Sequence, residues 1–138
     1  MSSQPASHLV DGRLAPCGEK PNCVCSQDDR PEHFIEPLTF TNAPSEAWAR
    51  LVSVVLNQPR TTLVQETPEY LRVEFRSRLF RFVDDVEFLL QPTNRTIEVR
   101  SASRVGHSDL GVNRARVERI RTAFASAQSA EPRPTTAR

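Results

Sequence analysis

The sequence lacks the features that define several large classes of protein. It contains no apolar run of the roughly 18 residues that a membrane-spanning helix requires. Its N-terminal stretch lacks the positively charged start and the apolar core of a signal peptide. We therefore expect no membrane span and a cytoplasmic location.

Glycine and lysine are both scarce. There are 4 glycines against 11 prolines, which excludes a collagen-like chain and indicates stiff connections between elements. Lys20 is the only lysine beside 17 arginines, and the formal net charge is +1. A chain so nearly neutral has no overall field to attract nucleic acid, which is therefore not an expected partner. Arginine binds carboxylate or phosphate through two parallel N–H groups, so local arginine clusters are candidate binding sites.

Cysteine is limited to Cys17, Cys23 and Cys25. Together with His33 these thiols carry the atom types that bind zinc, but the Cys23-Val24-Cys25 spacing departs from the Cys-x-x-Cys type of pair in structural zinc sites. We therefore expect no metal and no other cofactor. A disulfide between Cys17 and Cys23 would close a short loop and fix the N-terminal arm, and free thiols are the alternative.

The order of the apolar patterns predicts one α+β domain over residues 13–126. Residues 13–33 show no periodicity and contain three prolines, so we expect an extended arm. Apolar stripes of helical period predict helices at about 43–57 and 113–127. Alternation with a period of two predicts strands at 33–40, 60–66, 70–78, 80–90 and 95–104.

These elements predict a single antiparallel sheet of four to five strands in meander order. Both helices are expected on its apolar face, in the order β-α-β-β-β-β-α. Residues 1–12 and 127–138 are polar and aperiodic, and we expect both to be disordered tails.

Asp84 lies in an otherwise apolar row of a predicted strand. A turn at residues 92–95 would place it opposite Ser103, with Ser101 two positions along the same strand. An unpaired carboxylate in this row would cost on the order of several kcal/mol. We therefore predict that Asp84 accepts hydrogen bonds from Ser101, Ser103 and the following loop, and so joins that loop to the sheet.

The other face of the sheet is expected to be exposed to solvent. A turn at residues 78–79 would place Val73 opposite Asp84 on the apolar face. On the solvent face the same turns predict cross-strand ion pairs, Arg72 with Asp85 and Glu87 with Arg100.

The junction between the last strand and the second helix reads RSASRVGHSDLGVNRARVERIR over residues 100–121 and contains six arginines. Arg114 and Arg116 occupy the first helical turn, where the helix dipole favours negative charge. Either Asp109 or Glu118 pairs with these arginines, or a bound anion does. We predict a site for a small anion or a partner's carboxylate, formed by Asp84, Arg100, Ser101, Ser103, Arg104, His107, Asp109, Asn113 and Arg114.

Two other hypotheses use the same residues. A hydrolase-like enzyme would employ Asp84, His107 and Ser101, although no nucleophile elbow or oxyanion motif accompanies them. A purely structural cluster would join sheet and helix and bind no ligand. The leading hypothesis is a non-enzymatic binding module, with no catalytic residue assigned.

Four segments resemble, in this order, the family catalogued as domain of unknown function 1499: LAPCGEKPNCVCSQ (14–27), HFIEPLTF (33–40), FVDDVEF (82–88) and residues 100–121. The resemblance covers about residues 14–125. It implies that Cys17 and Cys23 are the family-like pair, because Cys25 stands where a serine is usual. It also implies relatives with a membrane or export segment ahead of the domain. The family has no assigned activity, so the resemblance implies an architecture and no reaction.

Overall fold

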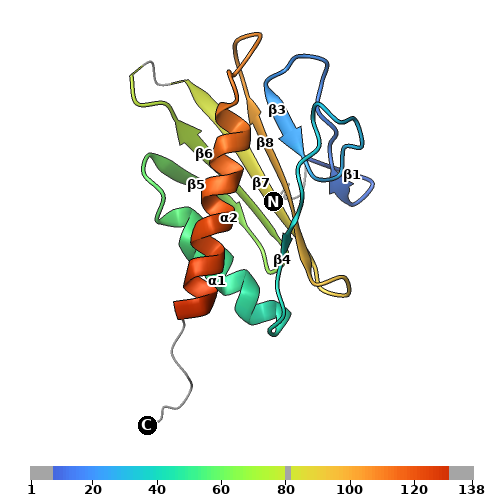
Figure 1. The fold of residues 1–138 in the computed structure, drawn as a ribbon, viewed down its shortest axis with the longest axis vertical. Helices are drawn as coiled ribbons and strands as arrows, with labels where there is room; N and C mark the ends of the chain where they lie inside the picture. Colours follow the sequence, from blue (N-terminus) through green and yellow to red (C-terminus); the bar gives the residue numbers. More distant parts are fainter. Residues whose placement is uncertain (1–7, 80–81, 131–138) are drawn as a thin grey trace.

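A mostly antiparallel sheet carries two helices on one face in the computed structural model, which describes residues 8–79 and 82–130 (Figure 1). Along the chain the elements are β1 (Leu9–Val10), β2 (Arg13–Leu14), β3 (Cys23–Cys25), β4 (Leu38–Thr39), α1 (Pro44–Leu56), β5 (Thr61–Glu66), β6 (Tyr70–Arg76), β7 (Val83–Gln91), β8 (Thr96–Ser103) and α2 (Val112–Ala130).

The main sheet has six strands rather than the predicted four to five, in the order β3-β8-β7-β6-β5 with β4 also pairing with β8. Strands β5 to β8 form the predicted antiparallel meander. The unexpected strand is β3, which pairs antiparallel with β8 inside the segment expected to be an unpaired arm. Three residues are too few to show alternation, so periodicity could not reveal this strand.

The two helices enclose the core against one face of the sheet. Pro44 begins α1, as suits a residue without an amide hydrogen in the first turn. The apolar stripes of both helices pack on the sheet, and each fully buried side chain contributes roughly 1.5–3 kcal/mol. The core includes Trp48, Leu51 and Val55 of α1, Val117, Ile120 and Phe124 of α2, and Val73, Val86, Phe88 and Val99 of the sheet.

Some residues of each predicted tail belong to secondary structure. Residues 1–7 and 131–138 lie outside the described residues. Residues 8–12 include β1, which pairs antiparallel with β2, and a turn at Asp11 and Gly12 with positive φ values of 53° and 75°. At the other end α2 continues past 127 to Ala130. A strand of two residues is too short to show an alternating pattern, so periodicity could not reveal β1 and β2.

The register around Asp84 agrees with the prediction on one side only. Asp84 pairs with Ser103 of β8, as expected. On β6, however, its partner is Phe75 instead of Val73. The β6–β7 hairpin closes where Ser77 N donates to Phe82 O at 2.8 Å, so its loop is longer than the predicted turn. A shift of two positions leaves every side chain on its original face, so Asp84 still faces the helices.

The second face of the sheet is covered, and the expectation of a solvent-exposed face is wrong. The arm and the β1–β2 hairpin lie over it and form a second apolar cluster of Leu14, Cys17, Cys23, Cys25, Tyr70 and Leu89. Glu87, expected in solvent, is 2% exposed. The sheet is therefore the middle of three layers, with the helices on one side and the arm on the other.

Candidate functional site

Asp84 of β7 is buried beneath α2, with 8% of its surface exposed. Its carboxylate accepts a hydrogen bond from Arg116 Nη2 at 2.7 Å. The Arg116 guanidinium also lies over the Phe75 ring, 4.8 Å from its centroid. Burial lowers the pKa of Arg116, and the adjacent Asp84 charge opposes that shift. Asp84 therefore has the partner that its burial requires, but this partner is Arg116 and not Ser101, Ser103 or a loop amide.

Asn113 in the first turn of α2 connects three parts of the chain and is fully buried. Its Oδ1 accepts hydrogen bonds from Ser101 Oγ at 2.6 Å and Arg116 Nη1 at 2.8 Å. Its Nδ2 lies within hydrogen-bonding distance of Asn22 O (3.2 Å), Ser103 Oγ (2.9 Å) and Asp109 Oδ2 (2.7 Å). One side chain thus links the arm, β8 and the loop before α2.

Asp109 caps α2 rather than pairing with an arginine of its first turn. Its Oδ1 accepts the Gly111 amide hydrogen at 2.8 Å, and its Oδ2 accepts that of Asn113 at 3.1 Å. A carboxylate at this end of a helix offsets the positive end of the dipole. Glu118, the other predicted partner, pairs with Arg121 at 2.9 Å. Within residues 8–79 and 82–130 neither carboxylate forms an ion pair with Arg114 or Arg116, so this one of the two alternatives is not observed.

Asp84, Ser101, Asn113 and Arg116 form one buried hydrogen-bonded cluster. Ser101 is fully buried and donates its hydroxyl hydrogen to Asn113, so this oxygen has no access to a substrate. A nucleophile needs a base in hydrogen-bonding contact. His107 instead lies in the exposed loop after β8. The hydrolase-like hypothesis therefore gains no support from the geometry.

Arg100 and Arg104 belong to the opposite face of the sheet from Asp84. Arg104 binds Asp85 (Nε to Oδ2, 2.8 Å) and Glu74 (Nη2 to Oε2, 2.8 Å). Burial alone would raise the pKa of Asp85, but hydrogen bonds from Arg104 and its charge lower it below the usual range. Arg100 donates from Nε to the carbonyl oxygen of Ala15 at 2.8 Å. The nine residues predicted as one site therefore occupy two faces.

The two predicted cross-strand pairs on the covered face have different outcomes. Arg72 Nη2 lies 3.1 Å from Asp85 Oδ1, so this ion pair is present, although the two residues are not directly opposite. Glu87 and Arg100 are directly opposite, yet Arg100 points its Nε at the arm. Burial raises the pKa of Glu87, and the charges of Arg100 and Arg72 oppose that shift.

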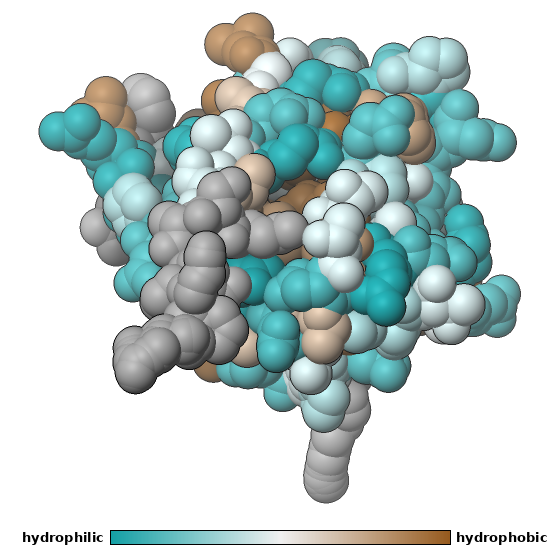
Figure 2. Space-filling model, turned by 60° about the horizontal axis from the view of Figure 1, so that its bottom comes forward, coloured by the Kyte–Doolittle hydropathy of each residue, from teal (hydrophilic) through white to brown (hydrophobic). Residues whose placement is uncertain are grey.

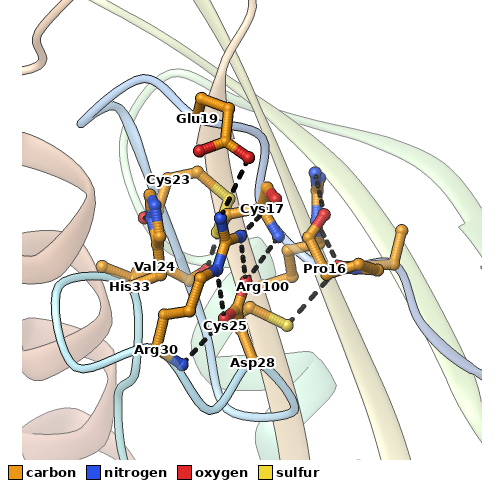
Figure 3. A network of polar contacts seen from close by, with 11 residues as sticks. Pro16, Cys17, Glu19, Cys23, Val24, Cys25, Asp28, Arg30, His33 and Arg100 are labelled. Atoms are coloured by element: carbon orange, nitrogen blue, oxygen red, sulfur yellow. Dashed lines mark hydrogen bonds and ion pairs between the residues drawn. A yellow bond between two sulfur atoms is a disulfide. The ribbon is translucent and has the colours of Figure 1, made fainter.

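A disulfide between Cys17 and Cys23 fastens the arm to β3 (Figure 3). Both cysteines are buried, and a disulfide offers no thiolate to a metal, so the zinc alternative does not apply to them. Cys25 keeps a free thiol with no exposed surface. Burial raises the pKa of this thiol to about 11, so it stays protonated and unreactive.

The carboxylate of Asp28 holds the arm in place next to the disulfide. Asp28 is buried, and its carboxylate accepts a hydrogen bond from the Cys17 amide at 2.8 Å. It accepts two more from Arg30, one from the amide at 3.1 Å and one from the guanidinium Nη2 at 2.7 Å (Figure 3). The hydrogen bonds from Arg30 hold the pKa of Asp28 well below its usual range. His33 is also buried, with Nδ1 3.0 Å from the Cys23 carbonyl oxygen. These contacts make the arm an ordered layer.

An open cleft of about 230 Å³ lies between the arm and the start of α2. Arg114 and Asp109 line it from α2 and the preceding loop, and Glu32 lines it from the arm. The remaining lining residues are Pro21, Cys23, Val24, Ser108 and Gly111. Asp109 and Arg114 are the predicted site residues that line this cleft.

Residues 13–124 match the protein family described as a protein of unknown function, DUF1499. The chain belongs to the DUF1499 family. Comparison with curated proteins and with solved structures found no match. No helix of this DUF1499 protein within residues 8–79 and 82–130 is long and apolar enough to cross a bilayer. A family of unknown function brings no reaction with it, so function is argued from the site.

Sequence reasoning missed Arg116, the central cation of the buried cluster. A signal for it exists, because Asn113, Arg116, Val117 and Ile120 follow the i, i+3, i+4, i+7 spacing of the buried stripe of α2. A polar residue in an apolar stripe needs a buried partner, as Asp84 does on β7. Asp84 and Arg116 are thus two charged residues in apolar rows, and pairing them would have predicted the ion pair.

Proposed function

We propose that this DUF1499 protein is a non-enzymatic binding module that holds a carboxylate, of a small molecule or of a partner protein, in the cleft between the arm and α2. The observation that carries this proposal is the state of Arg114. It is exposed and lines the cleft, and within residues 8–79 and 82–130 no hydrogen bond or ion pair engages its guanidinium. A guanidinium binds a carboxylate through two parallel hydrogen bonds.

The predicted site residues have different parts in this proposal. Arg114 is the ligand-binding cation, and His107 lies in the loop that leads to the cleft. Asp109 caps the helix that presents Arg114. Asp84, Ser101, Ser103 and Asn113 hold α2 against the sheet beneath the cleft, and Arg100 and Arg104 lie outside it.

The charges that line the cleft favour a singly charged anion. Glu32 shares the lining with Arg114, and Asp109 adds a second carboxylate. Two like charges about 4 Å apart repel each other by several kcal/mol where water is partly excluded. A phosphate dianion would meet this repulsion more strongly than a carboxylate, so we expect carboxylates to bind better.

Thermal unfolding in the presence of millimolar acetate, propionate or phosphate tests this function. We expect the carboxylates to raise the unfolding temperature, by the equivalent of about 1 kcal/mol when their concentration is several times Kd. Arg114→Gln should abolish the increase. The control Arg119→Gln, which removes another exposed arginine of α2 that does not line the cleft, should leave it unchanged. Equal stabilisation of wild type and Arg114→Gln, or none by any carboxylate, would overturn the proposal.

A further inference from the structure

Large apolar side chains are exposed at the tips of two loops. Leu110 is 92% exposed and Leu79 is 79% exposed, and Phe82, Val105 and Val112 are about half exposed. We call these five residues the apolar loop tips. Exposed apolar groups that gather in one region mark an interaction surface, whereas scattered ones do not.

The apolar loop tips share one end of the molecule. Leu79 and Phe82 belong to the connection between β6 and β7, Val105 and Leu110 belong to the connection between β8 and α2, and Val112 is the first residue of α2. Arg104 N, at the end of β8, donates to Val83 O at 3.2 Å, so the two connections start from adjacent strands. Both lie at the upper end of the ribbon in Figure 1, and brown side chains project from the upper margin of Figure 2.

The loop that carries Leu110 is built to present it outward. Leu110 has a positive φ of 53°, which a leucine side chain disfavours. Ser108 Oγ accepts the Leu110 amide hydrogen at 3.2 Å, Asp109 N donates to Pro21 O at 3.2 Å, and Asn22 Nδ2 donates to Gly106 O at 2.9 Å. The polar groups of the loop thus face the protein while its leucine faces solvent. Neither the backbone angle nor the exposure of Leu110 stabilises the fold, so both point to a function.

Exposed cations lie close to the apolar loop tips. Arg78 precedes Leu79, Arg114 lies two positions after Val112, and Lys20 is next to Pro21, whose carbonyl oxygen accepts the Asp109 amide hydrogen. Of the carboxylates at this end, Glu19 lies beside Lys20, Glu32 shares the cleft with Arg114, Asp109 caps α2, and Asp85 and Glu74 are paired with Arg104. Apolar groups with cations nearby complement the interface of an anionic bilayer, where lipid phosphates lie above hydrocarbon.

We propose that the apolar loop tips dock this protein on the surface of an anionic lipid bilayer, with their side chains in the outer hydrocarbon and the nearby cations on the lipid phosphates. A fluid bilayer suits side chains that project singly from convex loops. A protein partner would need a continuous complementary surface of about 800 Å² on each side. This docking goes beyond the proposed carboxylate binding and does not depend on it.

Co-sedimentation with vesicles tests the docking. We expect the wild-type chain to bind vesicles that contain phosphatidylglycerol, and to bind vesicles of phosphatidylcholine alone at least about tenfold more weakly. Leu110→Ser should lower the vesicle partition coefficient about tenfold, because burial of a leucine side chain contributes at least that factor. Leu79→Ser should act in the same direction.

Matched variants keep the result interpretable. Leu63→Ser removes an exposed leucine from β5, away from the two loops, and should leave vesicle binding unchanged. Leu110→Asn replaces the leucine with a residue that tolerates positive φ, so it should unfold at or above the wild-type temperature and still bind weakly. It should also keep the carboxylate-induced thermal shift, which separates this proposal from the function of Arg114. No binding to anionic vesicles, or equal losses from Leu110→Ser and Leu63→Ser, would overturn the inference.

Discussion

At the scale of single residues, the ion pair between Asp84 and Arg116 explains how a carboxylate fits an apolar row. Removing both charges from water is costly, and the 2.7 Å contact together with the hydrogen bonds of Arg116 to Ser101 and Asn113 offsets that cost. The pair contributes little net stability beyond an apolar replacement. Its two halves, however, depend strongly on each other.

Loss of either half of this pair should therefore be far more harmful than loss of both. Asp84→Leu or Arg116→Met alone leaves an uncompensated buried charge, and we expect each to lower the free energy of unfolding by about 3–5 kcal/mol. The double variant should be at least about 2 kcal/mol more stable than the sum of the single effects predicts. Urea denaturation measures all three, with Arg119→Met as the exposed-arginine control. Additive losses would show that the pair is not coupled.

At the scale of secondary-structure elements, the arm depends on attachments that are distant from its own sequence pattern. β3 pairs with β8, the Cys17–Cys23 disulfide closes a loop beside β3, and Asp28 holds the Cys17 amide. Because Cys25 is a residue of β3 and is fully buried, its thiol reports whether the arm is packed on the sheet.

Reduction of the disulfide should loosen the arm without removing the fold. A bridge across a sequence separation of 6 residues stabilises by about 2 kcal/mol in the loop-entropy account, so reductant should lower the free energy of unfolding by about that amount. In the oxidised native protein Cys25 should resist alkylation, because it is buried and its pKa is raised to about 11. Mass spectrometry of alkylated peptides should show faster labelling of Cys25 after reduction. Rapid labelling of the oxidised protein would contradict a closed arm, and Cys25→Ser controls for any effect of this thiol on stability.

At the scale of the whole molecule, the three layers bury the carboxyl group of Glu87 between the sheet and the arm, with incomplete hydrogen bonding from either layer. Glu87 lies between the sheet and the arm, and its Oε1 has no hydrogen-bond partner within the part of the chain that the structure describes. Burial raises the pKa of Glu87. Because its folded pKa lies above its unfolded pKa, its contribution to stability is present below the unfolded pKa and is lost as pH rises through the folded pKa.

The Glu87→Gln variant has no ionisable group at this position, so it should not lose this stability as pH rises. We expect the variant to have a higher free energy of unfolding than wild type at neutral pH, with the difference shrinking as pH falls toward the usual range of glutamate, about 4.3. Urea denaturation between about pH 4 and 7 measures the difference. Glu69→Gln, at an exposed glutamate, should follow the wild type at every pH. Asp28 has a lowered pKa and contributes in the opposite direction, so both proteins lose that contribution in acid. A variant less stable than wild type at neutral pH would contradict the effect of burial.

The parts of the fold that could be predicted are those governed by local patterns. α1, α2 and the β5–β8 meander follow from apolar periodicity, and the pairing of Asp84 with Ser103 follows from a short turn between adjacent strands. The partner of Asp84 does not follow from the pattern of one element, because Arg116 is 32 positions away and only a comparison of β7 with the buried stripe of α2 brings the two residues together. Membership of the DUF1499 family was likewise readable from motifs, and it adds no reaction.

By itself, therefore, the sequence determined the helices, the meander, and the fact that a carboxylate at position 84 faces the apolar side of the sheet, because all of these depend on the period of neighbouring residues. Only the tertiary structure decided that the arm covers the second face, that Arg100 and Arg104 lie away from Asp84, and that Arg114 meets an open cleft. The reason is that long-range burial depends on which surfaces meet. A segment without a period, such as residues 13–33, carries no local sign of the surface it will cover.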